Sequence, residues 1–215
     1  MMAGKVEPPG VFLNASAVIS RQLTAFCFDR WVATGIDTSA IPKALKPVLT
    51  NIEKGDLLAF PYNLTEFVKQ NALELLEAFY GLFVDEFSDR TREYLARFIY
   101  DDGDFDGLEQ RIIKRLFDLV KERKSLVENV GTLQRLITKL QKLPDDEATR
   151  EKIDSAQIER GGLQAILREI NSKHTLNFFT DEGLIPNYSF PEAGVILRSV
   201  IYRKKSNAVP GESAY

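Results

Sequence analysis

The sequence predicts a mainly α-helical protein, in which a helical bundle carries a protruding, long antiparallel coiled-coil hairpin and a short β or irregular segment follows. Apolar residues recur with helical spacing through residues 11–180, and in 108–143 they alternate in steps of four and three. β-Branched residues gather only in 195–203, which is typical of one strand. The expected segments are an irregular lead-in at 1–10, a helical body at 11–103, the hairpin at 104–180, and a junction, short strand and flexible tail at 181–215.

Four helices are expected in the body. Capping residues, a proline at a first helical position and a breaking glycine, Gly55, divide them. The expected bounds are, in order, Asn14 or Ser16 to about residue 33, Pro42 to Ile52, Asn63 or Thr65 to Phe87, and Ser88 or Asp89 to about Ile99.

The hairpin is predicted from two helical seams separated by a short turn at 144–146. Because the second seam, in 147–179, matches the first, the two helices are expected to pair antiparallel. This pairing places Gly131 near Gly161 and Gly162, which indicates either a close helix crossing or tolerated glycines in long helices. The first seam is Ile112, Leu116, Leu119, Arg123, Leu126, Val130, Leu133, Ile137 and Leu140, and the second is Ile153, Ala156, Arg160, Leu163, Leu167 and Ile170.

Composition excludes several classes of chemistry. The chain has 215 residues, a net charge of -3 and a single cysteine and histidine. It shows neither a secretion signal nor a membrane-spanning run, so a cytoplasmic protein without membrane contact is expected. Cys27 lies in an apolar run and is interpreted as a buried small side chain, and His174 as a helix-surface residue. Without a phosphate-binding loop or a Cys/His cluster, the chain alone is expected to have no catalytic, cofactor or zinc site.

One half-motif suggests calcium. Asp102, Asp104 and Asp106 alternate with glycine and phenylalanine as in the first half of a calcium-binding loop. The twelfth position is Ile113, where a bidentate glutamate is required. The favoured interpretation is therefore a turn whose carboxylates lie near the positive N-terminal end of the next helix.

Charge is unevenly distributed along the chain. Acidic residues dominate 53–109, whereas basic residues dominate 110–143. This arm could lie along a phosphate backbone, although solvated coiled-coil flanks have similar composition. The candidates for nucleic-acid contact are Lys114, Arg115, Lys121, Arg123 and Lys124.

The run Gly-Leu-Ile-Pro-Asn-Tyr-Ser-Phe-Pro at 183–191 resembles a Gly-Leu-Leu-Pro-x-Tyr-Ala-Phe-Pro element of large DEAD/DEAH-box helicases of the MrfA-like and DISARM phage-defence kind. Residues 8–13 and 21–23 are similar to the segment that enters the helical region preceding this element. The resemblance implies a helical region behind the second motor domain and before a zinc-containing domain. It also implies a structural junction, with Tyr188 and Phe190 packing into a neighbouring domain. The implied junction residues are Gly183, Pro186, Tyr188, Phe190 and Pro191.

The helicase motifs themselves are missing, so no catalytic residue carries over, and ATP and magnesium would belong only to a parent ATP-dependent motor. The sequence thus predicts a noncatalytic accessory module that braces a motor and contacts neighbouring domains, DNA or a partner subunit. The alternative is a self-contained coiled-coil module for protein interaction or homodimerisation.

Overall fold

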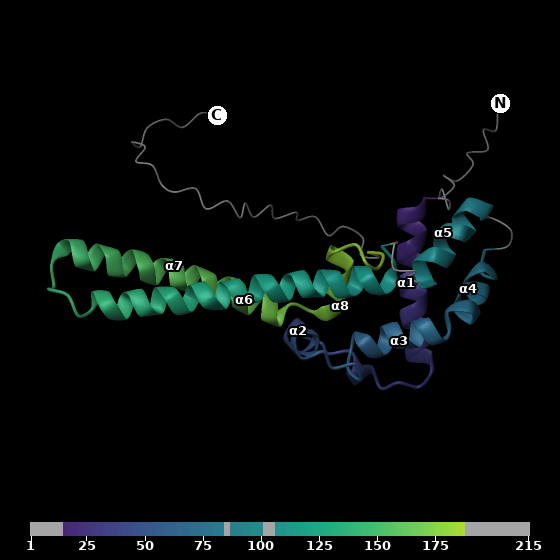
Figure 1. Cartoon of the computed structure of the whole chain (residues 1–215), viewed down its shortest axis with the longest axis horizontal. Coiled ribbons are helices and arrows are strands. Elements are labelled where there is room, and N and C mark those ends of the chain that lie inside the picture. The colour runs from purple at the N-terminus through teal and green to yellow at the C-terminus, as the bar shows by residue number, and fades with distance from the viewer. Residues whose placement is uncertain (1–14, 84–86, 101–105, 188–215) are drawn as a thin grey trace, which may run out of the picture.

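The computed structural model describes residues 15–83, 87–100 and 106–187. These residues form helices and no strand, which confirms the mainly α class. A bundle of short helices carries two long helices that extend well beyond it (Figure 1). The elements are α1 (Ser16–Ala33), a 3₁₀ turn η1 (Thr38–Ala40), α2 (Leu45–Lys54), α3 (Tyr62–Gln70), α4 (Ala72–Tyr80), α5 (Asp89–Tyr100), α6 (Leu108–Leu140), α7 (Glu147–Ser172) and α8 (Thr175–Asp181).

Helix α1 is the centre of the body, because α3, α4 and α5 all pack against it. Its start was predicted within a residue, although the backbone of Ala15 occupies the N-cap position that was expected of Asn14 or Ser16. The buried Thr24 hydroxyl donates to the Ser20 carbonyl at 2.9 Å, so this polar group is satisfied inside the core. The buried residues of α1 are Ile19, Ser20, Leu23, Thr24, Cys27, Phe28 and Trp31.

An aromatic cluster joins distant parts of the chain in this core. The ring of Phe60 lies 6.0 Å from that of Phe28, 6.1 Å from Trp31 and 5.8 Å from Phe179. Phe179 belongs to α8, which follows the hairpin in sequence. The chain therefore leaves the body through α6 and returns through α7 to complete the same core.

Two expected helices are interrupted where the sequence has neither glycine nor proline. The helix expected from Asn63 or Thr65 to Phe87 was wrong, because it divides at Asn71 into α3 and α4. The Asn71 side-chain amide donates to the Phe67 carbonyl at 2.8 Å, and its backbone leaves the helical region. This side-chain bond competes with continuation of the helix and lets α4 turn toward α5.

The second interruption separates α7 from α8, which had been expected as one helix to residue 179. Two backbone hydrogen bonds join this linker to the segment before α2. The Lys43 carbonyl accepts from Thr175 N–H and the Lys173 carbonyl accepts from Leu45 N–H, both at 2.9 Å. The Thr175 hydroxyl also donates to the Pro42 carbonyl at 2.5 Å. Because Ala44 is extended for this pairing, α2 begins at Leu45 and not at Pro42. His174 lies in the extended linker and not on a helix surface.

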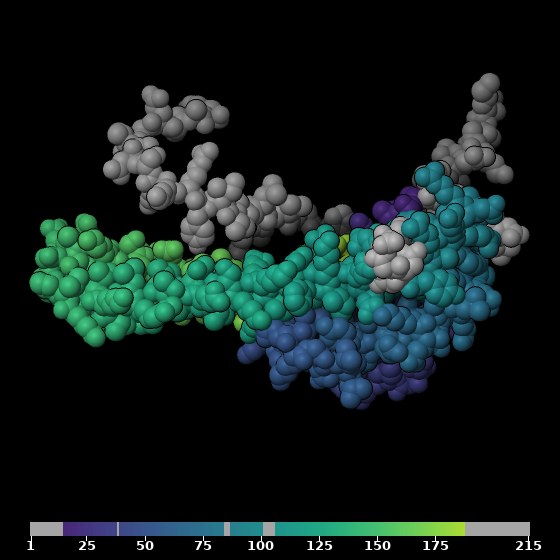
Figure 2. Space-filling view, in the orientation of Figure 1, coloured from purple at the N-terminus to yellow at the C-terminus, as the bar shows by residue number. Residues whose placement is uncertain are grey.

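Helices α6 and α7 form an antiparallel pair that leaves the body as a narrow arm (Figure 2). Arg123 bonds to Asn171 and, closer to the turn, Arg160 bonds to Gln134, as antiparallel helices require. Asp146 caps α7 by accepting from Thr149 N–H at 2.7 Å. All fifteen positions of the two predicted seams are buried or half-buried.

Gly131 and Gly161 do not mark a close helix crossing. A Cβ built on Gly131 or Gly161 would meet no atom within 4 Å. Of the two interpretations, tolerated glycines in long helices fits these two positions.

The hairpin has a root inside the body and an outer part that protrudes. Root residues of α6, from Leu108 to Val120, belong to the main core together with Phe178 and Phe179 of α8. Arg123 marks the boundary: its guanidinium donates to Asn171 on α7 at 2.9 Å and pairs with Glu53 on α2 at 3.2 Å. One arginine thus ties both arms of the hairpin to the body.

Candidate nucleic-acid interface at the root of the hairpin

A glycine turn after α8 fixes the first half of the expected junction. Gly183 has φ +66°, and Leu184 N–H donates to the Phe179 carbonyl at 2.8 Å, which ends the helix in a left-handed cap. Leu184 is buried in the main core. Tyr188, Phe190 and Pro191, the remaining junction residues apart from Pro186, lie outside the described residues, as does the expected strand at 195–203.

The Gly183 turn lies against α1. A Cβ on Gly183 would lie 3.1 Å from Nη2 of Arg21 and 3.2 Å from its Cζ. Glycine is therefore favoured here for two reasons, its positive φ and the guanidinium packed beside it.

A cationic hollow opens where α1, α6 and this turn meet. Its volume is about 290 Å³. Four cationic side chains and two carboxylates line it, so its walls carry a positive excess although the whole chain is acidic. The charged residues of the cationic hollow are Arg21, Arg111, Lys114, Arg115, Asp106 and Glu182.

Arg111 is held in a defined orientation in this hollow. Its Nε donates to Asp106 at 2.8 Å from the carbonyl oxygen and 3.1 Å from Oδ2. Its Nη2 lies 3.3 Å from the Tyr94 hydroxyl, and its Cζ lies 5.1 Å from the centre of the Phe98 ring. An oriented guanidinium loses less conformational entropy when it binds an anion than a freely rotating one.

The structure separates the five predicted nucleic-acid candidates into different surroundings. Lys114 and Arg115 lie in the cationic hollow, where Arg115 Nε is 3.7 Å from Glu182. Lys121 pairs with Asp118 at 3.7 Å, and Arg123 is occupied by its bonds to α2 and α7. Lys124 is exposed beyond the root.

Sequence reasoning missed Arg21 as a candidate. This residue lies on α1, about ninety positions before Lys114. The local charge of the α6 segment therefore held no signal for it. The one available signal is that Arg21 is a charged residue among the apolar positions of α1, which indicates a surface position.

The calcium interpretation finds no support in the described part of the chain. Asp102 and Asp104 lie outside it, and Asp106 uses its carboxylate on Arg111. Among residues 15–83, 87–100 and 106–187, no three His, Cys, Asp or Glu side chains gather as a metal site would require.

Cys27 and His174 do not form a catalytic pair. Cys27 lies in the core, where burial raises the pKa of its thiol to about 12, so the nucleophilic thiolate is disfavoured. His174 is exposed in the linker before α8.

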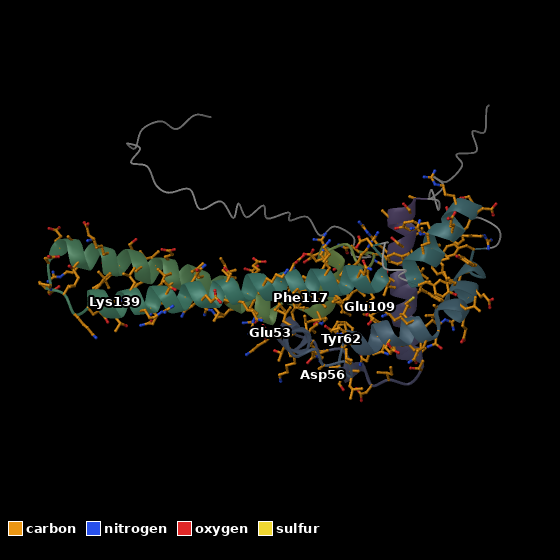
Figure 3. The ribbon with its side chains drawn as sticks, viewed as in Figure 1. Glu53, Asp56, Tyr62, Glu109, Phe117 and Lys139 are labelled. Carbon is orange, nitrogen blue, oxygen red and sulfur yellow. The ribbon has the colours of Figure 1, made fainter. Side chains whose placement is uncertain are left out.

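An aromatic groove adjoins the cationic hollow and shares Lys114 with it. The groove has a volume of about 480 Å³ and lies between the start of α3 and the root of α6. Figure 3 shows Tyr62, Glu109 and Phe117 together in this region, with Lys139 far along the hairpin. Phe117 is 47% exposed, and Lys121 Nζ lies 5.1 Å from the centre of its ring. The groove is lined by Tyr62, Glu109, Gln110, Ile113, Lys114, Phe117, Asp118 and Lys121.

Comparisons with protein-family models, curated proteins and solved structures give no match for this chain. Within the described residues, no helix combines the length and apolar character needed to cross a membrane.

Proposed function

We propose that this chain is a noncatalytic helical accessory module of a large DEAD/DEAH-box helicase, in which the body braces the motor and the root of the hairpin contacts DNA or a partner subunit. The observation that carries the proposal is the position of the Gly183 turn. The segment that resembles the helicase junction begins at the cationic hollow, so the proposed exit toward a further domain lies beside a surface with a positive excess.

The arrangement of the core also supports a bracing role. Helix α8 packs Phe178 and Phe179 into the same core as α1, and Leu184 follows them. A load on the segment after residue 187 would therefore be transmitted to the centre of the body and not to the outer hairpin.

Two measurements test this proposal. The coding sequence on both sides is expected to encode a motor upstream and a cysteine-rich region downstream, and a start and a stop codon at the ends of this chain would contradict a helicase module. The purified chain is expected to show no ATP hydrolysis above buffer. Turnover that stays with the protein through purification would contradict the noncatalytic role.

The second candidate function is a protein-interaction or homodimerisation module. It is favoured by apolar side chains that remain exposed on the outer hairpin: Leu136 at 44%, Leu143 at 54% and Ile158 at 77%. A shallow hollow of about 240 Å³ lies beside them, lined by residues of both arms including Leu133 and Ala156. Light scattering over a concentration series distinguishes this candidate, which requires a dimer that Leu136→Asp dissociates while Leu73→Asp, at a body position also exposed, does not.

A further inference from the structure

The cationic hollow and the aromatic groove form one continuous surface on the root of α6, because Lys114 lines both. We propose that this surface binds single-stranded nucleic acid, with a backbone phosphate in the cationic hollow and a neighbouring base against Phe117 in the aromatic groove. The inference shares with the proposed function only the assumption that the partner is a nucleic acid. It does not require that the chain belong to a helicase.

The charge balance of the cationic hollow suits a phosphate. Of its four cations, Arg21 and Lys114 have no ion-pair partner among the described residues, and the contact of Arg115 with Glu182 is long at 3.7 Å. A phosphate oxygen entering the hollow therefore gains Arg21 and Lys114 without breaking an existing ion pair. Arginine forks bind phosphate through paired N–H donors, and three arginines line this space, Arg21 from α1 and Arg111 and Arg115 from α6.

The geometry of the hollow is preorganised. Tyr94, Phe98 and Asp106 orient Arg111, and the Gly183 turn packs against Arg21. A volume of about 290 Å³ equals that of roughly nine or ten water molecules at about 30 Å³ each, which is room for a phosphate group and part of its hydration shell.

The aromatic groove is the reason to choose single-stranded nucleic acid over other phosphate ligands. Sites for single strands combine a cationic track with exposed aromatic rings on which bases stack. Phe117 is half exposed and lies three residues after Lys114, a little under one turn of α6, within the same open groove as Tyr62. In a duplex the bases are stacked on each other and are not free to occupy such a groove.

The surface is confined to the root of the hairpin. At the outer end of the aromatic groove Asp118 pairs with Lys121. Beyond the groove, Arg123 is occupied by Glu53 and Asn171, and Glu122 adds a further exposed acid. The proposal thus assigns binding to Arg21, Lys114 and Phe117, and not to the basic arm as a whole.

The test is fluorescence anisotropy of a labelled single-stranded oligothymidylate of about 12 nucleotides, a length within the site sizes of known single-strand binders, at low salt. Lys114→Glu and Arg21→Gln are expected to weaken binding strongly, and Phe117→Ala by roughly tenfold, as loss of one stacked base does. Asp106→Asn is expected to tighten binding, because it removes a negative charge from the hollow while the Asp106 backbone carbonyl still accepts from Arg111 Nε and keeps it oriented. Lys139→Glu is the matched control: it makes the same charge change on the same helix, far from the hollow, and should leave binding unchanged.

Three results would overturn the inference. The first is no binding of the wild-type chain at low salt, and the second is equal weakening by Lys114→Glu and Lys139→Glu. The third is that inorganic phosphate or polyglutamate, at matched charge, competes as well as the unlabelled oligothymidylate does. Preference for the duplex over the single strand would overturn the role of Phe117. Circular dichroism of each variant verifies that it is folded. Binding that follows this pattern in a chain without a helicase parent would sustain the inference while contradicting the proposed function.

Discussion

The helical body and the outer hairpin bury their apolar side chains in different ways. In the body, α1 is covered by three helices and large rings meet in clusters, so Leu23, Trp31 and Phe60 are almost fully buried. In the outer hairpin, each helix has one partner, and most seam positions beyond Arg123 are only half-buried. A single helix pair cannot surround its apolar residues, so its stability accumulates slowly along its length. The comparison predicts a cooperative body and a hairpin that opens locally.

The largest loss of stability is expected when a ring in the body core is truncated. Phe179 is fully buried and lies 5.5 Å from Phe28 and 5.8 Å from Phe60, measured between ring centres. Phe179→Ala should lower the free energy of unfolding by about 3–5 kcal/mol, because it removes buried area and leaves a cavity. Urea denaturation measures this loss. Phe117→Ala, the same change at a half-exposed site, should cost less than about 1 kcal/mol. Equal losses would show that the body core is not the centre of stability.

A smaller effect, with a different distribution, is expected in the outer hairpin. Ile137 is 2% exposed in the seam, and Ile137→Ala should destabilise the hairpin by about 2–4 kcal/mol. Because the outer hairpin has few contacts to the body, hydrogen exchange should accelerate near the end of α6 and the start of α7 while α1 amides remain protected. Leu136→Ala, at the adjacent exposed position, is the control and should change exchange little. Faster exchange in α1 would mean that the two regions unfold together.

Arg123 tests the connection between the two regions. Its side chain is 18% exposed and that of Glu53 is 23% exposed, so their pair is partly shielded from solvent. Arg123→Met keeps the apolar stem but removes the bonds to Glu53 and Asn171, and should cost about 1–2 kcal/mol. A double-mutant cycle with Glu53→Gln measures the coupling, expected at about 0.5–1 kcal/mol. Lys124→Met, next in sequence and exposed, should have almost no effect.

The smallest changes in stability are expected from glycine-to-alanine substitutions, and they differ in sign. Gly131→Ala and Gly161→Ala should each stabilise the hairpin by about 0.5–1 kcal/mol, because alanine is the better helix former and its Cβ meets no neighbour. Gly183→Ala should destabilise the chain, because a left-handed residue with a Cβ is strained and would contact Arg21. Thermal unfolding of the three variants measures both signs. A loss of stability at Gly131 would restore the close-crossing interpretation.

The sequence predicted the helical elements well where periodicity is long. The seam of α6, the turn at Asp146 and the break at Gly55 follow from apolar spacing, capping and a glycine, all of which act locally. The breaks at Asn71 and His174 were missed. The first depends on a side-chain bond that competes with the helix, and the second on backbone pairing with residues 42–45, about 130 positions away.

The candidate site was predicted only in part for the same reason. Lys114 and Arg115 belong to a basic segment that is visible in sequence, and Gly183 to a run that resembles a helicase junction. By itself, the sequence determined the class of fold, the two long helices and the uneven charge, because helix formation and charge are properties of neighbouring residues. Only the tertiary structure decided that Arg21 joins Lys114 beside the Gly183 turn and that Arg123 is used inside the protein. Those arrangements depend on which helix faces meet, and helix packing is set by side chains far apart in the chain.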